Sequence, residues 1–186
     1  MADYTVRKED IALLKEQGMV AEDLEHSLQV AEKALEIGRR MQGDLDMVLL
    51  GRGALFHDLG KTTTHGITHG LLGAEKGADL GLPAAVNAIM EKHIRGGLTE
   101  EEAVELGLPV KDYTLHLLEE RVIIYADRLV DIIHDGIVQI DDEREAETRF
   151  KEILRDEIKY GKNDITTERY YRYHDEIQSL MKIQAS

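Results

Sequence analysis

The stretch Ala54-Leu-Phe-His-Asp-Leu-Gly-Lys61 joins the end of an apolar segment to a histidine–aspartate pair and a glycine. Leu50, Ala54 and His57 follow the i, i+4, i+7 spacing of one helix face, so His57 extends the inward face of a helix. Asp58 lies roughly 100° further around that helix, so both polar side chains can approach one point only if the helix ends here. The glycine that follows supplies such an end. The stretch therefore predicts a helix that presents an imidazole and a carboxylate to the interior at its carboxyl end.

The rest of the chain has the composition and spacing of an all-helical protein. Its 186 residues include two prolines, Pro83 and Pro109, and 5% aromatic residues, and they lack the strand-like alternation of β-branched residues. We therefore predict an all-α fold, a compact helical bundle in a single domain. The expected helices cover residues 7–17, 21–41, 45–57, 69–80, 83–94, 99–106, 115–134, 143–159 and 166–182.

Several of these helix ends carry local signals. Gly18 and Gly81 suit the carboxyl ends of helices, and Pro83 suits a first helical turn. Thr99 followed by Glu102 matches a capping box, in which each residue satisfies a backbone amide of the other. These signals predict the ends of individual helices and say nothing of how the helices pack.

Composition excludes several classes of function. Cysteine is absent, so a disulfide scaffold, a thiol nucleophile and a thiolate metal site are ruled out, and any metal must bind nitrogen and oxygen. The 23 Lys and Arg against 37 Asp and Glu give a net charge of −14 without a basic run, so duplex nucleic acid is not an expected partner. No apolar run approaches the ~20 residues that span a bilayer, and the N-terminus lacks a signal-peptide core. We therefore expect a cytoplasmic protein without membrane contact.

Further polar residues interrupt helix faces that are otherwise apolar. A lone histidine on such a face is usually a core residue with satisfied ring nitrogens, and Asp127 could pair with Arg121 or Arg128 of its own helix. Several inward imidazoles together with inward carboxylates are better explained by a divalent cation, because a buried carboxylate must regain the energy of its lost hydration. Helical spacing adds four such residues to the histidine–aspartate pair: His26, His69, His93 and Asp127, with Asp131 on the face of Asp127.

The order of these residues resembles the H…HD…D signature of the HD superfamily of metal-dependent phosphohydrolases. Residues 57–61 match the HD-x-G-K element, and the two later histidines match the dinuclear branch, in which the order is H, HD, H, H, D. The resemblance covers about residues 22–133, and residues 93–127 are also similar to a group of small stand-alone archaeal and bacterial HD proteins. It implies an HD-type helical fold, with helices in residues 143–182 packed on the motif core within one domain of residues 1–186.

The resemblance also implies a set of metal ligands. By this resemblance a first ion has the ligands His26, His57, Asp58 and Asp127, and a second ion has His69 and His93, with Asp58 bridging the two. One or two divalent ions are expected, and nitrogen and oxygen ligands suit Mn, Fe, Co, Ni or Zn and, less well, Mg. Such ions would activate water for attack on a phosphate ester.

Two cationic residues near the ligands are candidates for substrate binding. Lys61 lies three residues after Asp58 in the longest predicted loop, residues 58–68, and Arg95 lies beside a glycine pair. Each cation could hold phosphate oxygens, and the alternative for each is a solvated loop side chain. We expect Asp58 and Lys61 to act in catalysis, and Lys61 and Arg95 to bind substrate. His65 of the same loop is either a proton donor or a loop histidine without a role.

The expected function is a metal-dependent phosphohydrolase, either a phosphomonoesterase or a phosphodiesterase, that acts on a small nucleotide or a related phosphate ester. The chain lacks the Gly-Tyr-Pro element of the cyclic-di-GMP phosphodiesterase branch, which disfavours that substrate. Two alternatives stay open. The ligand order also resembles the di-iron oxygenase branch of the superfamily, and a metal-dependent nucleotide-binding module without turnover would keep the same ligands.

Polar and aromatic residues outside the motif are expected to be structural. A helical stripe near the C-terminus favours core packing, with a homodimer contact as the alternative: Tyr170, Tyr173, His174, Ile177 and Met181. Three histidines match no motif position and are expected in the structure or on the surface: His116, His134 and His174.

Overall fold

The computed structural model describes residues 4–181, in which helices and loops account for the whole architecture. The β pairing within this range is a single isolated bridge between Met41 and Met181, so the predicted all-α fold class is confirmed. No helix in this range is long and apolar enough to cross a membrane. The α-helices are α1 (Lys8–Glu16), α2 (Ala21–Arg40), α3 (Met47–Phe56), α4 (His69–Asp79), α5 (Ala84–Lys92), α6 (Glu100–Glu105), α7 (Leu118–His134), α8 (Glu143–Thr148), α9 (Phe150–Asp156), α10 (Ile158–Gly161) and α11 (Asp164–Ser179), and the 3-10 turns are η1 (Leu59–Thr62) and η2 (Ile94–Gly96).

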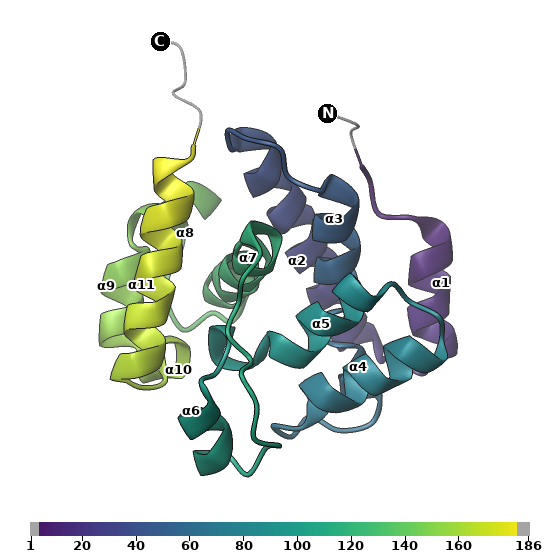
Figure 1. Ribbon diagram of the computed structural model, residues 1–186. Coiled ribbons are helices and arrows are strands. Elements are labelled where there is room, and N and C mark those ends of the chain that lie inside the picture. Colours follow the sequence, from purple (N-terminus) through teal and green to yellow (C-terminus); the bar gives the residue numbers. More distant parts are fainter. Residues whose placement is uncertain (1–3, 182–186) are drawn as a thin grey trace.

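Helix α7 lies at the centre, between the α2–α3 pair and α11 (Figure 1). Its buried residues Val122, Ile123, Ala126 and Leu129 recur at helical spacing and face both sets of neighbours. Burial of each larger aliphatic side chain contributes about 1.5–3 kcal/mol to folding. The central position of α7 therefore follows from its apolar surface, and the same helix carries Asp127 into the interior.

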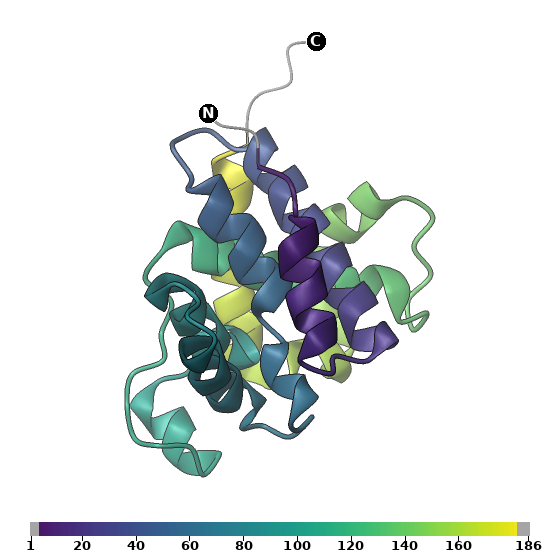
Figure 2. The same cartoon turned by 90° about the vertical axis from the view of Figure 1, so that its right-hand side faces the viewer.

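Helix α1 covers the outer side of α3. The guanidinium of Arg52 in α3 donates to both carboxylate oxygens of Asp10 in α1, at 2.9 and 2.8 Å. Gly51 receives the ring of Tyr4, since a Cβ at this glycine would lie 2.4 Å from a ring carbon. Figure 2 shows α1 in front of α2 and α3, on the side away from the C-terminal helices.

Glycines bring α4 into backbone contact with η1 and α5. A Cβ on Gly60 would lie 1.8 Å from the carbonyl oxygen of His69 and 2.7 Å from the amide nitrogen of Gly73. A Cβ on Gly70 would lie 2.8 Å from the carbonyl oxygen of Met90. Side chains cannot occupy these positions, so the glycines permit the close approach. This close approach places His69, the first residue of α4, beside Asp58, the residue before η1.

The predicted helix ends agree with the structure in most cases. Gly18 and Gly81 follow α1 and α4 with left-handed φ angles of +86° and +74°. In the capping box, Glu102 donates its backbone N–H to the Thr99 hydroxyl at 3.3 Å and accepts from the Thr99 backbone N–H at 2.9 Å. Pro83 is the residue before α5, one position earlier than its predicted place in the first turn.

The single helix predicted for residues 143–159 is wrong, because α8, α9 and α10 replace it. The backbone departs from helical geometry at Arg149 and Glu157, where ψ is 6° and 100°. Beyond Glu157, α10 folds back on α9, and a Cβ on Gly161 would lie 2.4 Å from the carbonyl oxygen of Leu154. Seven residues of continuous helix would separate these two positions by about 10 Å. The buried residues still follow one helical stripe, which is why the sequence resembles an uninterrupted helix.

The helical stripe near the C-terminus packs in the core, which is the arrangement that the sequence favours. Ile177 is fully buried in α11, and His174 is half-buried beside it. The hydroxyl of Tyr125 in α7 is hydrogen-bonded to Nδ1 of His174 at 2.9 Å, and Phe150 stacks on the His174 ring with an interplanar angle of 7°. Burial lowers the pKa of His174. The other two histidines without a motif position, His116 and His134, are exposed.

Candidate metal centre

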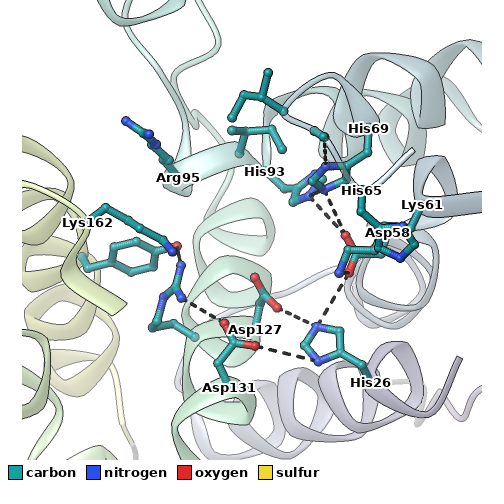
Figure 3. Close-up of a pocket in the computed structure, with 15 residues that line it drawn as sticks. His26, Asp58, Lys61, His65, His69, His93, Arg95, Asp127, Asp131 and Lys162 are labelled. Atoms are coloured by element: carbon teal, nitrogen blue, oxygen red, sulfur yellow. Dashed lines mark hydrogen bonds and ion pairs between the residues drawn. The ribbon is translucent and has the colours of Figure 1, made fainter. Parts of the chain in front are cut away.

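The structure brings the six predicted metal ligands together at the meeting point of five helices. Most of them line one cavity of about 380 Å³ (Figure 3). The ring of His57 is buried beside Asp58. The ligands come from separate elements: His26 from α2, His57 and Asp58 after α3, His69 at the start of α4, His93 at the end of α5 and Asp127 from α7.

The carboxylate of Asp58 is divided between two pairs of imidazoles. Its Oδ2 atom lies 3.2 Å from Nε2 of His57 and 3.8 Å from Nε2 of His26. Its Oδ1 atom lies 3.2 Å from Nε2 of His69 and 3.4 Å from Nε2 of His93. The Asp58 side chain is only 3% exposed, so these rings replace water as its surroundings. Each carboxylate oxygen therefore faces its own pair of nitrogen donors.

Backbone hydrogen bonds fix the orientation of three of the rings. Each donates its Nδ1–H to the carbonyl three residues earlier, at 2.7 Å for His57 and His93 and 2.8 Å for His69. A carbonyl can only accept, so Nδ1 must carry the hydrogen and, in a neutral ring, Nε2 keeps its lone pair. The same arrangement supports metal-binding histidines in many proteins. All three rings therefore direct their Nε2 atoms toward Asp58.

The converging Nε2 atoms fit a bound cation. Nε2 of His69 and Nε2 of His93 are 2.8 Å apart, so in two neutral rings the lone pairs of these atoms would face and repel each other. Nε2 of His57 is buried and has no hydrogen bond of good geometry from residues 4–181. Buried polar atoms in native proteins nearly always have partners. Nitrogen and oxygen donors of this kind suit first-row divalent metals, so the residues fit such an ion.

Asp127 faces imidazoles instead of the arginines of its own helix. Its Oδ1 atom lies 3.0 Å from Nε2 of His26 and 3.6 Å from Nε2 of His57. The guanidinium of Arg121 binds a glutamate of α11, and that of Arg128 binds the aspartate one turn after Asp127. Within residues 4–181, Asp127 therefore does not form the alternative salt bridge with Arg121 or Arg128 of its own helix.

The two carboxylates are held in their ionised form. Burial would raise the pKa of Asp58, but the surrounding imidazoles hold it well below its usual range. For Asp127 the same burial is opposed by the hydrogen bond with His26 and by the charge of His57, and its pKa is also well below the usual range. Burial would lower the pKa of His57, but the charges of both carboxylates raise it well above the ordinary value. The centre is therefore a dense group of anionic oxygens and imidazole nitrogens.

The predicted substrate-binding cations and His65 take different positions. The ammonium of Lys61 lies 2.6 Å from Oδ2 of Asp58, and although burial would lower its pKa, the Asp58 charge raises it. Arg95 lines the cavity on the side away from Lys61 (Figure 3). Nε2 of His65 lies 3.0 Å from Oδ2 of Asp23, and its side chain is largely exposed at the rim. The loop histidine is thus anchored to α2.

Polar residues that were not predicted as metal ligands or substrate-binding residues also line the cavity, among them Arg128, Asp131, Lys162 and Tyr170. Asp131 lies 4.0 Å from Nδ1 of His26 and accepts a hydrogen bond from Arg128 at 2.9 Å. Burial and the nearby charge of Asp127 raise the pKa of Asp131 to about 6. Asp131 follows Asp127 by one helical turn, which is a signal for its position. Lys162 is distant in sequence from every ligand and carries no such signal.

The family of this chain follows from its sequence relatives. A model of the HD domain family matches residues 23–133. The chain is 40% identical over 162 residues to the uncharacterized protein MJ0778 of Methanocaldococcus jannaschii, and the match covers 86% of this chain and 89% of that protein. The chain therefore belongs to the HD domain family, as the resemblance of its motif implies.

Other relatives are longer proteins. A protein of Thermoplasma volcanium named tRNA (cytidine(56)-2'-O)-methyltransferase is 40% identical over 106 residues, which cover 57% of this chain and 31% of that protein. A protein of the same name from Picrophilus torridus is 36% identical over 134 residues, which cover 71% of this chain and 38% of that protein. The match accounts for less than half of either protein, and their name describes the whole of each.

Solved structures show the same fold. The HD domain of the L. monocytogenes phosphodiesterase PgpH, in complex with cyclic-di-AMP, superposes with a TM-score of 0.57 over 94% of this chain and 100% of that chain. A further crystal structure of the PgpH HD domain gives a TM-score of 0.53 over 90% of this chain and 96% of that chain. Sequence identity is 18% in both cases, so the likeness is one of fold.

Proposed function

We propose that this protein is a metal-dependent phosphohydrolase that hydrolyses a small nucleotide or a related phosphate ester. The division of the Asp58 carboxylate between two pairs of imidazole nitrogens carries this proposal, because it matches what two neighbouring cations require of a bridging ligand. Membership of the HD domain family supports the reaction class. The phosphodiesterase PgpH, whose HD domain has this fold and is found with cyclic-di-AMP, supports a nucleotide as the substrate.

The six inward residues would hold the two ions in two overlapping sets. In this proposal His26, His57 and Asp127 serve the first ion, His69 and His93 serve the second, and Asp58 serves both. Divalent cations bound there would acidify a coordinated water and neutralise charge on the phosphate. In the hydrolysis an oxygen of water forms the new bond to phosphorus, and the ester oxygen leaves as an alcohol after it takes a proton.

The side chains around the ligands position the substrate. Lys61 already lies on the cavity wall with its ammonium on Asp58, so a short movement would let it donate to a non-bridging phosphate oxygen. Arg95 can hold a second oxygen from the other side of the cavity. Asp131 lies 4.0 Å from Nδ1 of His26, so an approach of about 1 Å would let it accept the Nδ1 hydrogen and orient the ring, as carboxylates often do behind metal-binding histidines.

The test is metal analysis of protein purified without chelators, followed by hydrolysis of a panel of nucleoside monophosphates and cyclic dinucleotides with Mn, Co, Zn, Fe or Mg. We expect about two ions per chain and hydrolysis that persists in anaerobic buffer. Asp58→Asn should lose the bound ions and the hydrolytic activity. Asp175→Asn, the same change at an exposed position, should keep the ions and the activity. Iron with oxygen-dependent turnover would instead identify an oxygenase, and metal binding without hydrolysis of any phosphate ester would contradict the proposal.

A further inference from the structure

Three cations from distant segments meet on one side of the cavity. Arg95 follows α5, Arg128 belongs to α7, and Lys162 lies between α10 and α11. Figure 3 shows Arg95 and Lys162 across the cavity from Asp58 and Lys61. Lys162 lies outside residues 23–133, the part that matches the family model.

Two of these cations form no ion pair within residues 4–181. In residues 4–181 no hydrogen bond or ion pair involves the guanidinium of Arg95 or the ammonium of Lys162, although both line the cavity. Arg128 is 7% exposed and is held by Asp131 and a tyrosine hydroxyl, and its Nε atom is buried without a partner. Burial and the charges of Arg128 and Arg95 lower the pKa of Lys162, although the charge of Asp131 opposes them. At Lys162 the nearby cations outweigh Asp131, so a further anion between the three cations would relieve their repulsion.

Backbone conformation also marks Arg95 and Lys162. Among the described residues, these are the two non-glycine residues with left-handed φ angles, +50° and +66°. Glycine adopts this conformation freely, whereas a Cβ is crowded there. The chain elsewhere uses glycine in this conformation, for example at Gly81 and Gly107. Strained residues persist where their side chains are needed, and here both side chains reach the same cavity.

We propose that Arg95, Arg128 and Lys162 form an anion subsite that binds a second phosphate of the substrate, one that is not cleaved. The inference rests on the proposed function, in which the cleaved phosphate lies at the six metal ligands. It narrows the substrate class to compounds with two separated phosphates, such as a nucleoside bisphosphate or a dinucleotide. A cavity of about 380 Å³ is within the size range of small-molecule sites.

The experiment measures binding by calorimetry in the presence of Mn, with adenosine 3′,5′-bisphosphate, cyclic-di-AMP and the monophosphates 5′-AMP and 3′-AMP as probes. We expect the wild-type protein to bind one of the two-phosphate compounds about tenfold more tightly than the monophosphates, the gain expected from a hydrogen-bonded charge pair. The two-phosphate compound that shows the gain identifies the source of the second phosphate. Equal affinity for all four compounds would overturn the proposal.

Variants assign the gain to the subsite. Lys162→Ala should lose most of the preference and leave monophosphate affinity unchanged, whereas Lys159→Ala, three residues earlier and paired with Asp135, should keep it. Lys162→Gly should lose the preference and also raise Tm, because glycine tolerates the left-handed backbone. A Lys162→Gly variant with raised Tm and an intact preference would overturn the subsite and show a purely structural residue.

Binding and turnover separate this proposal from the proposed function. If the two-phosphate compound binds more tightly through Lys162 but no phosphate ester is hydrolysed, the subsite stands and the phosphohydrolase assignment fails. If monophosphates and two-phosphate compounds are hydrolysed with the same KM in the wild type and in Lys162→Ala, the phosphohydrolase stands and the subsite fails.

Discussion

Gly60→Ala should remove one of the two proposed metal sites without changing any ligand. The new Cβ would lie 1.8 Å from the carbonyl oxygen of His69, so the start of α4 must retreat by about 1.6 Å to reach ordinary van der Waals contact. Metal–ligand distances tolerate about 0.2 Å, so a retreat of this size would carry His69 out of reach of an ion on Asp58. Overpacking of this kind also costs about 1–3 kcal/mol, which for a chain of this length lowers Tm by roughly 3–10 °C.

The assay combines circular dichroism melts with calorimetric titration of Mn. We expect a folded Gly60→Ala protein with a lower Tm that binds one equivalent of Mn where the wild type binds two. Gly66→Ala is the matched control, because its Cβ would meet only a threonine hydroxyl at 3.3 Å, and it should keep both equivalents. Two equivalents at wild-type affinity in Gly60→Ala would refute the reasoning that this close backbone approach positions the second set of ligands.

Three further predictions concern the ligands and one histidine of the core. His57→Ala should lose one ion. Asp58→Ala should lose both ions, since the two carboxylate oxygens of Asp58 face the two sets of ligands. Metal content after desalting measures the loss, and full metal occupancy in either variant would contradict the assignment. The His69→Ala/His93→Ala double variant should lower Mn stoichiometry from two equivalents to one, and a single equivalent in both proteins would exclude a dinuclear centre. His174→Phe should flatten the pH dependence of stability. Burial lowers the pKa of His174 in the folded state, so the unfolded chain binds more protons below about pH 6.5 and wild-type stability falls there. Equal changes in Tm between pH 7.5 and pH 5.5 for the two proteins would contradict this.

Local sequence determines the helices and their ends, because the interactions responsible lie within a few residues. The left-handed glycine at Gly81 and the reciprocal hydrogen bonds of Thr99 and Glu102 agree with expectation. The end of α3 at Phe56 also agrees, and it lets His57 and Asp58 approach the same point. The order of histidines and aspartates on inward faces likewise predicts which side chains gather, since each position depends only on the spacing along its own helix.

Tertiary structure decides the features that depend on how distant segments pack. The pattern of residues 143–159 is that of one helix, whereas the non-helical backbone at Glu157 and the close approach of Gly161 to the Leu154 carbonyl show that α10 turns back on α9. That turn leads to Lys162, which reaches the cavity although its sequence neighbours match no motif. The division of the Asp58 carboxylate between two imidazole pairs depends on the approach of α4 to η1. The sequence does not predict this approach, because a stripe of apolar residues shows which face of a helix is buried but not how close the next helix lies. Sequence alone therefore names the six inward residues, whereas packing decides their mutual geometry and the cations that surround them.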